Sequence, residues 1–172
     1  MKFWENKTPD DLYNKVSTIP YGELVHNHAP SDISNPGKVL DGWWTTKTGG
    51  IAMSATTTVE GDSDWYAHWR TAAYRITLDG NRGEPASWLM PVEYGMSISS
   101  LPSVSRLGYT FLHWEDLDDE LAEDQRKIDR FPYVYQKMKD SVWQAQWKAN
   151  QYTVKFINGD GDKFQDFEYD TP

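Results

Sequence analysis

Gly37–Trp43 reads Gly-Lys-Val-Leu-Asp-Gly-Trp, and 71 positions later Gly108–Trp114 reads Gly-Tyr-Thr-Phe-Leu-His-Trp. Further along, Trp65–Trp69 (Trp-Tyr-Ala-His-Trp) returns 78 positions later as Trp143–Trp147 (Trp-Gln-Ala-Gln-Trp). The segments come in the same order in both halves, so the chain contains an internal repeat. Because the offset grows from 71 to 78, the second copy holds about seven additional residues, and these fall in an acidic stretch.

The last residues begin a third copy, because Tyr152–Phe156 matches Tyr74–Leu78. We therefore predict three segments: repeat unit 1 over residues 1–71, repeat unit 2 over 72–149, and the start of a truncated third repeat over 150–172. Such a chain is expected to be a piece of a longer array. The alternative is a short natural protein whose ends have decayed.

Tyr74–Leu78 and Ser141–Lys148 alternate apolar and polar residues with a period of two, which indicates half-buried strands. Turn residues follow the first of them at Asp79–Asn81. We expect about four strands in each repeat and a mainly β or α+β fold. The aromatic content of 15% agrees with this, because flat rings suit a half-buried sheet surface.

Helices are expected in few places. A short one is predicted in Pro9–Lys15 or in Ser97–Leu101. The longest candidate is the acidic stretch Asp116–Arg130, where Asp116 could cap a helix and apolar residues are spaced by three or four. A loop is the alternative for that stretch.

The charge balance restricts the class of partner. The formal net charge is −9, and residues 115–130 hold eight carboxylates and three bases, a local charge of −5. Nucleic acid binding needs basic side chains to neutralise phosphates, so we expect no nucleic acid partner. There is no cysteine, which excludes disulfides and thiolate metal sites.

No stretch approaches the 18 apolar residues of a membrane span, so direct membrane insertion is not expected. Met1–Asn6 lacks the apolar core of a signal peptide. We expect the signal peptide of the parent protein to lie outside this sequence.

Gly37–Gly50, followed by Trp65–Trp69, resembles the Listeria–Bacteroides repeat, also called the internalin B-type B repeat. The second copy follows the same pattern. The resemblance implies tandem small β-grasp-like (ubiquitin-like) units with a mixed sheet, in a bacterial surface or secreted protein, without catalytic residues. The sequence departs from the pattern at His113, where glycine is usual, and in the acidic stretch, which stands where copy one has Thr-Lys-Thr-Gly-Gly.

Most tryptophans occupy equivalent places in the two copies, and we expect these to be structural core. They are Trp43, Trp65, Trp69, Trp114, Trp143 and Trp147. Trp4, Trp44 and Trp88 have no counterpart in the other copy, and together with the acidic stretch they are the candidates for ligand contact. The alternative for these three rings is packing at the edge of a sheet or contact between repeats. In that stretch the candidate residues are Asp118, Glu120 and Glu123.

Catalytic and metal sites are not expected. His26 and His28 could offer two metal ligands, but a site needs three or four. No histidine recurs between the copies, which excludes a general base present in each unit. We therefore predict no enzyme activity, no metal and no cofactor, with weak cation binding by the acidic stretch as the open alternative.

The sequence favours a non-enzymatic extracellular segment of a bacterial cell-surface protein, monomeric within a longer array. We expect it to act as a spacer and as an adhesion or host-contact module, whose partner is a host or neighbouring surface protein or a glycan. The alternatives are a carbohydrate- or peptide-binding accessory module of a secreted hydrolase, and a phage or virion surface protein that carries such repeats.

Overall fold

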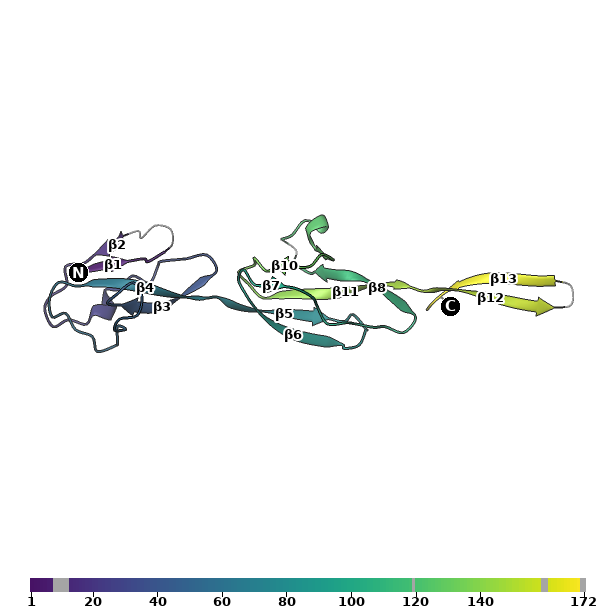
Figure 1. Cartoon of the computed structure of the whole chain (residues 1–172), viewed down its shortest axis with the longest axis horizontal. Coiled ribbons are helices and arrows are strands. Elements are labelled where there is room, and N and C mark those ends of the chain that lie inside the picture. Colours follow the sequence, from purple (N-terminus) through teal and green to yellow (C-terminus); the bar gives the residue numbers. More distant parts are fainter. Residues whose placement is uncertain (8–12, 119, 159–160, 171–172) are drawn as a thin grey trace. The chain divides into compact units, whose positions relative to one another are not determined.

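The computed structural model describes residues 1–7, 13–118, 120–158 and 161–170 (Figure 1). The chain forms two compact units, unit 1 (Met1–Ala72) and unit 2 (Ala73–Pro172). In the described residues the only helices are two short 3₁₀ turns, η1 (Val25–Asn27) and η2 (Glu123–Gln125). The prediction of a mainly β fold is confirmed, whereas the described residues contain no α-helix. The boundary predicted at residue 149 stays a prediction.

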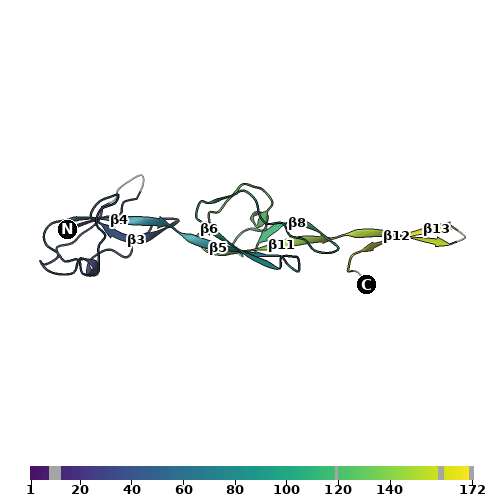
Figure 2. The same ribbon diagram turned by 60° about the horizontal axis from the view of Figure 1, so that its bottom comes forward.

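Unit 1 is a four-stranded mixed sheet in the order β2-β1-β4-β3. Its strands are β1 (Lys2–Trp4), β2 (Tyr13–Val16), β3 (Lys38–Trp44) and β4 (Asp64–Thr71). The first and last strands, β1 and β4, run parallel at the centre, and the other two pairs are antiparallel. Figure 2 shows β3 beside β4.

Unit 2 contains a five-stranded sheet in the order β6-β5-β11-β8-β9. The strands are β5 (Ala73–Asp79), β6 (Ser87–Glu93), β8 (Tyr109–Asp116), β9 (Lys127–Ile128) and β11 (Ser141–Ala149). Again the first and last strands of the repeat, β5 and β11, are parallel neighbours. A second, two-stranded sheet pairs β7 (Ser97–Ile98) with β10 (Tyr133–Val134).

The two repeats share an irregularity as well as a strand order. In unit 1 the register between β3 and β4 skips Asp41, because Leu40 pairs with Trp69 and Gly42 pairs with His68. In unit 2 the register between β8 and β11 skips Leu112, the residue equivalent to Asp41. A bulge at the same place in both sheets shows that the sequence repeat is a structural repeat down to single residues.

Each unit has its own apolar core. The buried tryptophans are Trp43 and Trp65 in unit 1, and Trp114 and Trp143 in unit 2. Trp69 and Trp147 are partly buried and pack against the same cores. Four of these rings come from the last strand of a repeat, which explains the Trp-x-Ala-x-Trp spacing: alternate residues of a strand face the same side.

In each repeat, an asparagine and a tryptophan join the residues just after the first strand to the last strand. In unit 1 the Asn6 side-chain amide donates to the Ala67 carbonyl (2.9 Å), and the Trp69 indole donates to the Glu5 carbonyl (2.7 Å). In unit 2 the equivalent bonds run from Asn81 to Ala145 (3.0 Å) and from Trp147 to Gly80 (3.0 Å). Asn6 and Asn81 both have a positive φ, +49° and +47°. We call each set the Asn–Trp pair.

We predict that Trp69→Ala and Trp147→Ala each unfold their own unit. The substitution removes a large core ring and the indole donor, at a cost of roughly 3–5 kcal/mol. Amide resonances followed by NMR during urea titration would measure the two units separately. A loss below about 1 kcal/mol in both variants would contradict a core role for these rings.

The helix predicted over Asp116–Arg130 is wrong. β8 continues to Asp116, a loop with the single turn η2 follows, and β9 then pairs Ile128 with Trp114. The acidic stretch is thus a loop closed by a short edge strand, because Ile128 is buried against the sheet while Leu117 is exposed. The helix predicted in Ser97–Leu101 is also wrong, since β7 begins there.

Part of the other predicted helix, Pro9–Leu12, lies outside the described residues. The rest, Tyr13–Lys15, belongs to strand β2, which pairs antiparallel with β1.

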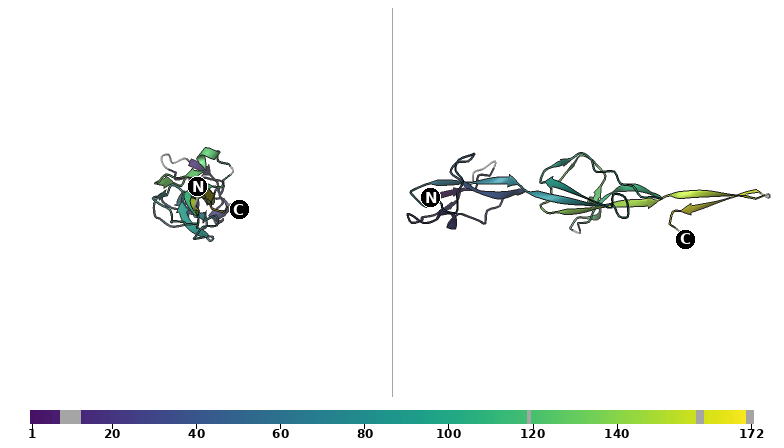
Figure 3. Two further views of the ribbon diagram at one scale, coloured as in Figure 1. Left: turned by 90° about the vertical axis from the view of Figure 1, so that its right-hand side faces the viewer. Right: turned by 90° about the horizontal axis from the view of Figure 1, so that it is seen from below.

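The strands β12 (Gln151–Asn158) and β13 (Gly161–Glu168) form an antiparallel hairpin (Figure 3). Tyr152, Val154 and Phe156 of β12 are 51%, 42% and 50% exposed, although the matching residues of β5 lie in or against the core of unit 2. Among the described residues, no further strand pairs with this hairpin.

Candidate functional site

An aromatic row crosses the outer face of the unit 1 sheet. Trp4, Tyr66 and Trp44 lie at directly paired positions on β1, β4 and β3, so their side chains project to the same side. That side is opposite the core, because Trp65 and Ala67, the neighbours of Tyr66 in β4, are buried. The rings of Trp4 and Tyr66 are nearly parallel, with centroids 6.3 Å apart. Two tryptophans singled out in the sequence thus lie in one row.

The row continues to His68, whose ring stacks on Trp44 with centroids 4.2 Å apart and planes 6° apart. The His68 Nε2–H donates to the Thr46 carbonyl at 3.0 Å, which holds the imidazole in place. Trp44 also lies over Gly42: a Cβ added there would be 3.0 Å from a ring carbon. With φ at +146°, this position favours glycine on backbone grounds too.

The equivalent face of unit 2 is polar. Asp79, Gln144 and Glu115 are aligned across β5, β11 and β8, in the places of Trp4, Tyr66 and Trp44. The Gln144 amide donates to the Asp79 carboxylate at 2.9 Å. His113 takes the place of Gly42, and without an aromatic ring two residues later it has room for its side chain. The two repeats therefore share a core but present different outer faces.

We predict that Gly42→Ala destabilises unit 1 by about 1–3 kcal/mol, since the new methyl group must displace Trp44 from a backbone that already disfavours a side chain. The matched control is His113→Gly in unit 2, where no ring needs the space and the cost of a glycine within a strand is about 0.5–1 kcal/mol. Urea unfolding with near-UV circular dichroism would report stability and ring packing together. Equal effects in both units would contradict this role for Gly42.

In unit 2 the acidic insert, residues 115–130, is held by two lysines that follow it in the chain. Lys137 Nζ lies 2.8 Å from Asp118, and Lys139 Nζ lies 3.0 Å from Asp118 and 2.7 Å from Glu120. Two of the three carboxylates proposed as ligand contacts are therefore occupied by the protein's own cations, and an external cation would have to displace them. Glu123 lies exposed in η2.

Beneath these surface pairs lies a buried carboxylate. Asp116 is 0% exposed, and its Oδ2 accepts hydrogen bonds from the Trp143 indole (2.9 Å) and from Lys137 Nζ (2.6 Å). Its other oxygen accepts from the Asp118 backbone at 3.2 Å. In unit 1 the corresponding indole, that of Trp65, donates to the Ser63 hydroxyl instead. The buried ion pair is thus specific to the second repeat.

The lysines change the titration of the insert. Hydrogen bonds from Lys137 and Lys139 hold the pKa of Asp118 well below its usual range. Burial alone lowers the pKa of Lys137, but hydrogen bonds with Asp116 and Asp118 outweigh burial and raise it. Asp118 and Lys137 therefore stay charged and paired across the neutral pH range.

We predict that unit 2 loses stability in acid. A carboxyl group whose pKa is depressed by folding stabilises the fold above its unfolded pKa, which is 3.8 for an ordinary aspartate, and this stabilisation is lost as the pH falls below that value. The melting temperature of unit 2 should drop between about pH 5 and pH 2. In the Asp118→Asn variant, the melting temperature of unit 2 should fall less over the same pH range. An unchanged fall would show that Asp118 does not cause the acid sensitivity.

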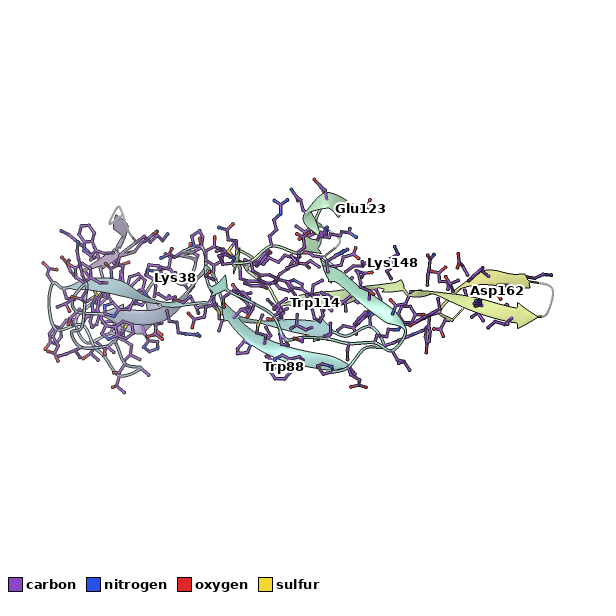
Figure 4. All side chains as sticks on the ribbon, turned by 45° about the vertical axis from the view of Figure 1, so that its right-hand side comes forward. Lys38, Trp88, Trp114, Glu123, Lys148 and Asp162 are labelled. Carbon is purple, nitrogen blue, oxygen red and sulfur yellow. The ribbon has the colours of Figure 1, made fainter. Side chains whose placement is uncertain are left out.

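The other residues proposed for ligand or metal binding do not lie together in one site. Trp88, on the edge strand β6, is 52% exposed and separate from the buried Trp114 (Figure 4). His28 lies 3.0 Å from Glu23, and His26 is exposed in η1. Within the described ranges, no three His, Asp or Glu side chains are placed to hold a metal ion. Nor does this part of the chain contain a helix with the length and apolar character that a membrane crossing requires.

Comparison with known proteins supports the repeat. The family model described as the Listeria-Bacteroides repeat domain matches residues 3–68 and again residues 74–127. The chain belongs to this family. Listeria–Bacteroides repeats are typical of bacterial surface proteins, and the two matches correspond to the two copies described above. No solved structure shows significant similarity to the chain.

Two relatives come from Evansella cellulosilytica. One, named "Putative membrane protein", is 26% identical over 150 residues, which cover 85% of this chain and 21% of the relative. The other, named "Putative Gly-rich membrane protein", is 24% identical over 149 residues, which cover 86% of this chain and 16% of the relative. The chain therefore spans about a fifth or less of these relatives.

Sequence reasoning missed the residues that connect strands far apart in the chain. Asn6 and Asn81 are not recognisable as a pair of equivalents, because only their contacts with β4 and β11 reveal their role. The sequence around Lys137 likewise carries no pattern that marks it as the partner of Asp116. The nearest signal is a pair of lysines, Lys137 and Lys139, that follows the acidic stretch and precedes Trp143 by a few residues.

Proposed function

We propose that this chain is a non-enzymatic, extracellular segment of a bacterial cell-surface protein, and that it acts as a spacer and as an adhesion or host-contact module. The observation that carries the proposal is the contrast between the repeats. Strand order, bulge and Asn–Trp pair are shared by the two repeats, whereas the outer face is aromatic in unit 1 and polar in unit 2. A retained scaffold with changing surfaces suits a repeated unit that sets distance and offers contacts, and its partner would be a surface protein or a glycan.

The relatives add support for attachment to the cell. Both are named as membrane proteins and are several times longer than this chain. A Listeria–Bacteroides segment that covers a fifth of such a protein suits a position between an anchor and a distal domain.

We also propose that each repeat is a β-grasp variant. The support is the strand order β2-β1-β4-β3 with its parallel central pair, repeated as β6-β5-β11-β8. In unit 1 the connection between β2 and β3 covers the core with Val25 of η1, where an α-helix would be usual in a ubiquitin-like domain.

Surface display can be tested on intact cells of the source bacterium. Antibodies raised against the chain should label unpermeabilised cells, and mild protease treatment should release fragments that the antibodies recognise. A cytosolic protein in the same samples controls for lysis. Labelling only after permeabilisation would overturn the extracellular assignment.

A second candidate function is ligand binding by the aromatic row, favoured by its confinement to unit 1. Half-buried rings on an open sheet face are suited to stacking on a sugar or on peptide side chains. A glycan array probed with the whole chain would test this. Trp44→Glu, which introduces the unit 2 residue, should abolish any binding, whereas Trp88→Ala should leave it intact; the reverse would assign the contact to β6.

A further inference from the structure

The first and last strands of each Listeria–Bacteroides repeat are parallel neighbours. In unit 2 the register runs from Ser141 opposite Ile76 to Gln144 opposite Asp79. The chain enters at the start of β5 and leaves at the end of β11, so entry and exit lie at opposite ends of this pair. Tension along the chain therefore slides the two strands past each other and loads all their hydrogen bonds at once.

The same arrangement holds in unit 1, where Lys2, Phe3 and Trp4 pair with Asp64, Trp65 and Tyr66. Only Ala72 separates β4 from β5, and only Asn150 separates β11 from β12. With a single residue between strands, tension passes from the last strand of one repeat to the first strand of the next without an intervening loop to extend.

The Asn–Trp pair lengthens the loaded contact. In unit 2 the last backbone pair joins Asp79 to Gln144, and the bonds from Asn81 to Ala145 and from Trp147 to Gly80 lie just beyond it. In unit 1 the corresponding two bonds follow the last pair, between Trp4 and Tyr66. Both repeats thus keep side-chain bonds at the place where sliding must break them.

We propose that each repeat is a force-bearing unit, in which the parallel strand pair and its Asn–Trp pair resist tension along the chain. The inference deepens the proposed spacer function and rests on it for its biological use. Its test needs only the purified chain, so a failure of the mechanical proposal and a failure of surface display are distinguishable.

The absence of native cysteine lets introduced cysteines set the pulling points. In one variant Ala73 and Lys148 are replaced, so force shears β5 against β11. In the other Ala73 and Glu93 are replaced; these residues pair directly, so force opens the β5–β6 hairpin one pair at a time. At one loading rate in optical tweezers, we expect a several-fold higher unfolding force for the first geometry. Equal forces, or a lower force in shear, would overturn the proposal.

A variant pair separates mechanical from thermodynamic effects. Asn81→Gly keeps the left-handed backbone but removes the amide, and should raise the unfolding rate at fixed shear force by roughly three- to tenfold, as expected for one hydrogen bond. Val92→Ala, in the core on β6, should lower equilibrium stability more but change that rate less. If Val92→Ala has the larger effect on the shear rate, the Asn–Trp pair carries no load.

Discussion

Replacing Trp143 by alanine is expected to unfold unit 2. The side chain is 0% exposed and packs edge-on against Tyr133, with centroids 5.1 Å apart, so its removal costs about 3–5 kcal/mol in packing. The buried Asp116 carboxylate also loses the indole donor at 2.9 Å, which adds about 1–3 kcal/mol. Together the two losses are about 4–8 kcal/mol, which is enough to unfold a small domain in the lower half of the usual stability range of about 5–15 kcal/mol.

NMR spectra of the whole chain would test this, because the resonances of unit 1 provide an internal reference. Trp143→Phe keeps much of the ring and should retain a folded unit of reduced stability. Trp88→Ala removes a half-exposed tryptophan of the same unit and should change stability by no more than about 0.5 kcal/mol. A folded, fully stable Trp143→Ala variant would contradict the core assignment.

The second large effect is expected for Lys137→Ala. It leaves the Asp116 carboxylate buried without its cation, and breaking a buried pair in this way costs about 3–5 kcal/mol. The loss should appear in urea unfolding of unit 2 while unit 1 is unaffected.

The double variant Asp116→Asn, Lys137→Met supplies the control. It replaces both charges by neutral groups of similar size, and the introduced amide oxygen could still accept a bond from Trp143. Most of the loss should be recovered, because the penalty comes from the unpaired charge rather than from the missing attraction. If the double variant is as unstable as Lys137→Ala, the ion pair is not the cause.

The strands of both repeats could be predicted because the alternation of apolar and polar residues that marks a strand lies within the strand's own sequence. Alternation within Ser141–Lys148 places the tryptophans on one side whatever the partner strands are, and β11 follows it closely. Repetition added independent support, since the same pattern occurs in β4. Trp4 and Trp44 could be singled out by their lack of counterparts, but only the strand register shows that Tyr66 lies between them.

The acidic insert could not be predicted, because its conformation depends on distant groups. Leu117, Leu121 and Ile128 have helical spacing, yet the partners that decide the conformation are Lys137 and Trp143. Their bonds to Asp116 extend β8 as a strand. Local apolar spacing is weak evidence when so few of the residues are apolar. The Asn–Trp pair was hidden for the same reason, since its bonds span more than 60 residues.

The contact between Trp44 and Gly42 constrains the order in which a repeat can change its outer face. In unit 2, His113 and Glu115 are two residues apart on β8 and face the same side, so a tryptophan introduced at Glu115 would compete with the His113 side chain for the space that Gly42 leaves to Trp44 in unit 1. The glycine must therefore be acquired before the ring, and the ring must be lost before the glycine. Engineering an aromatic face onto unit 2 should therefore start with His113→Gly and add the tryptophan at Glu115 second.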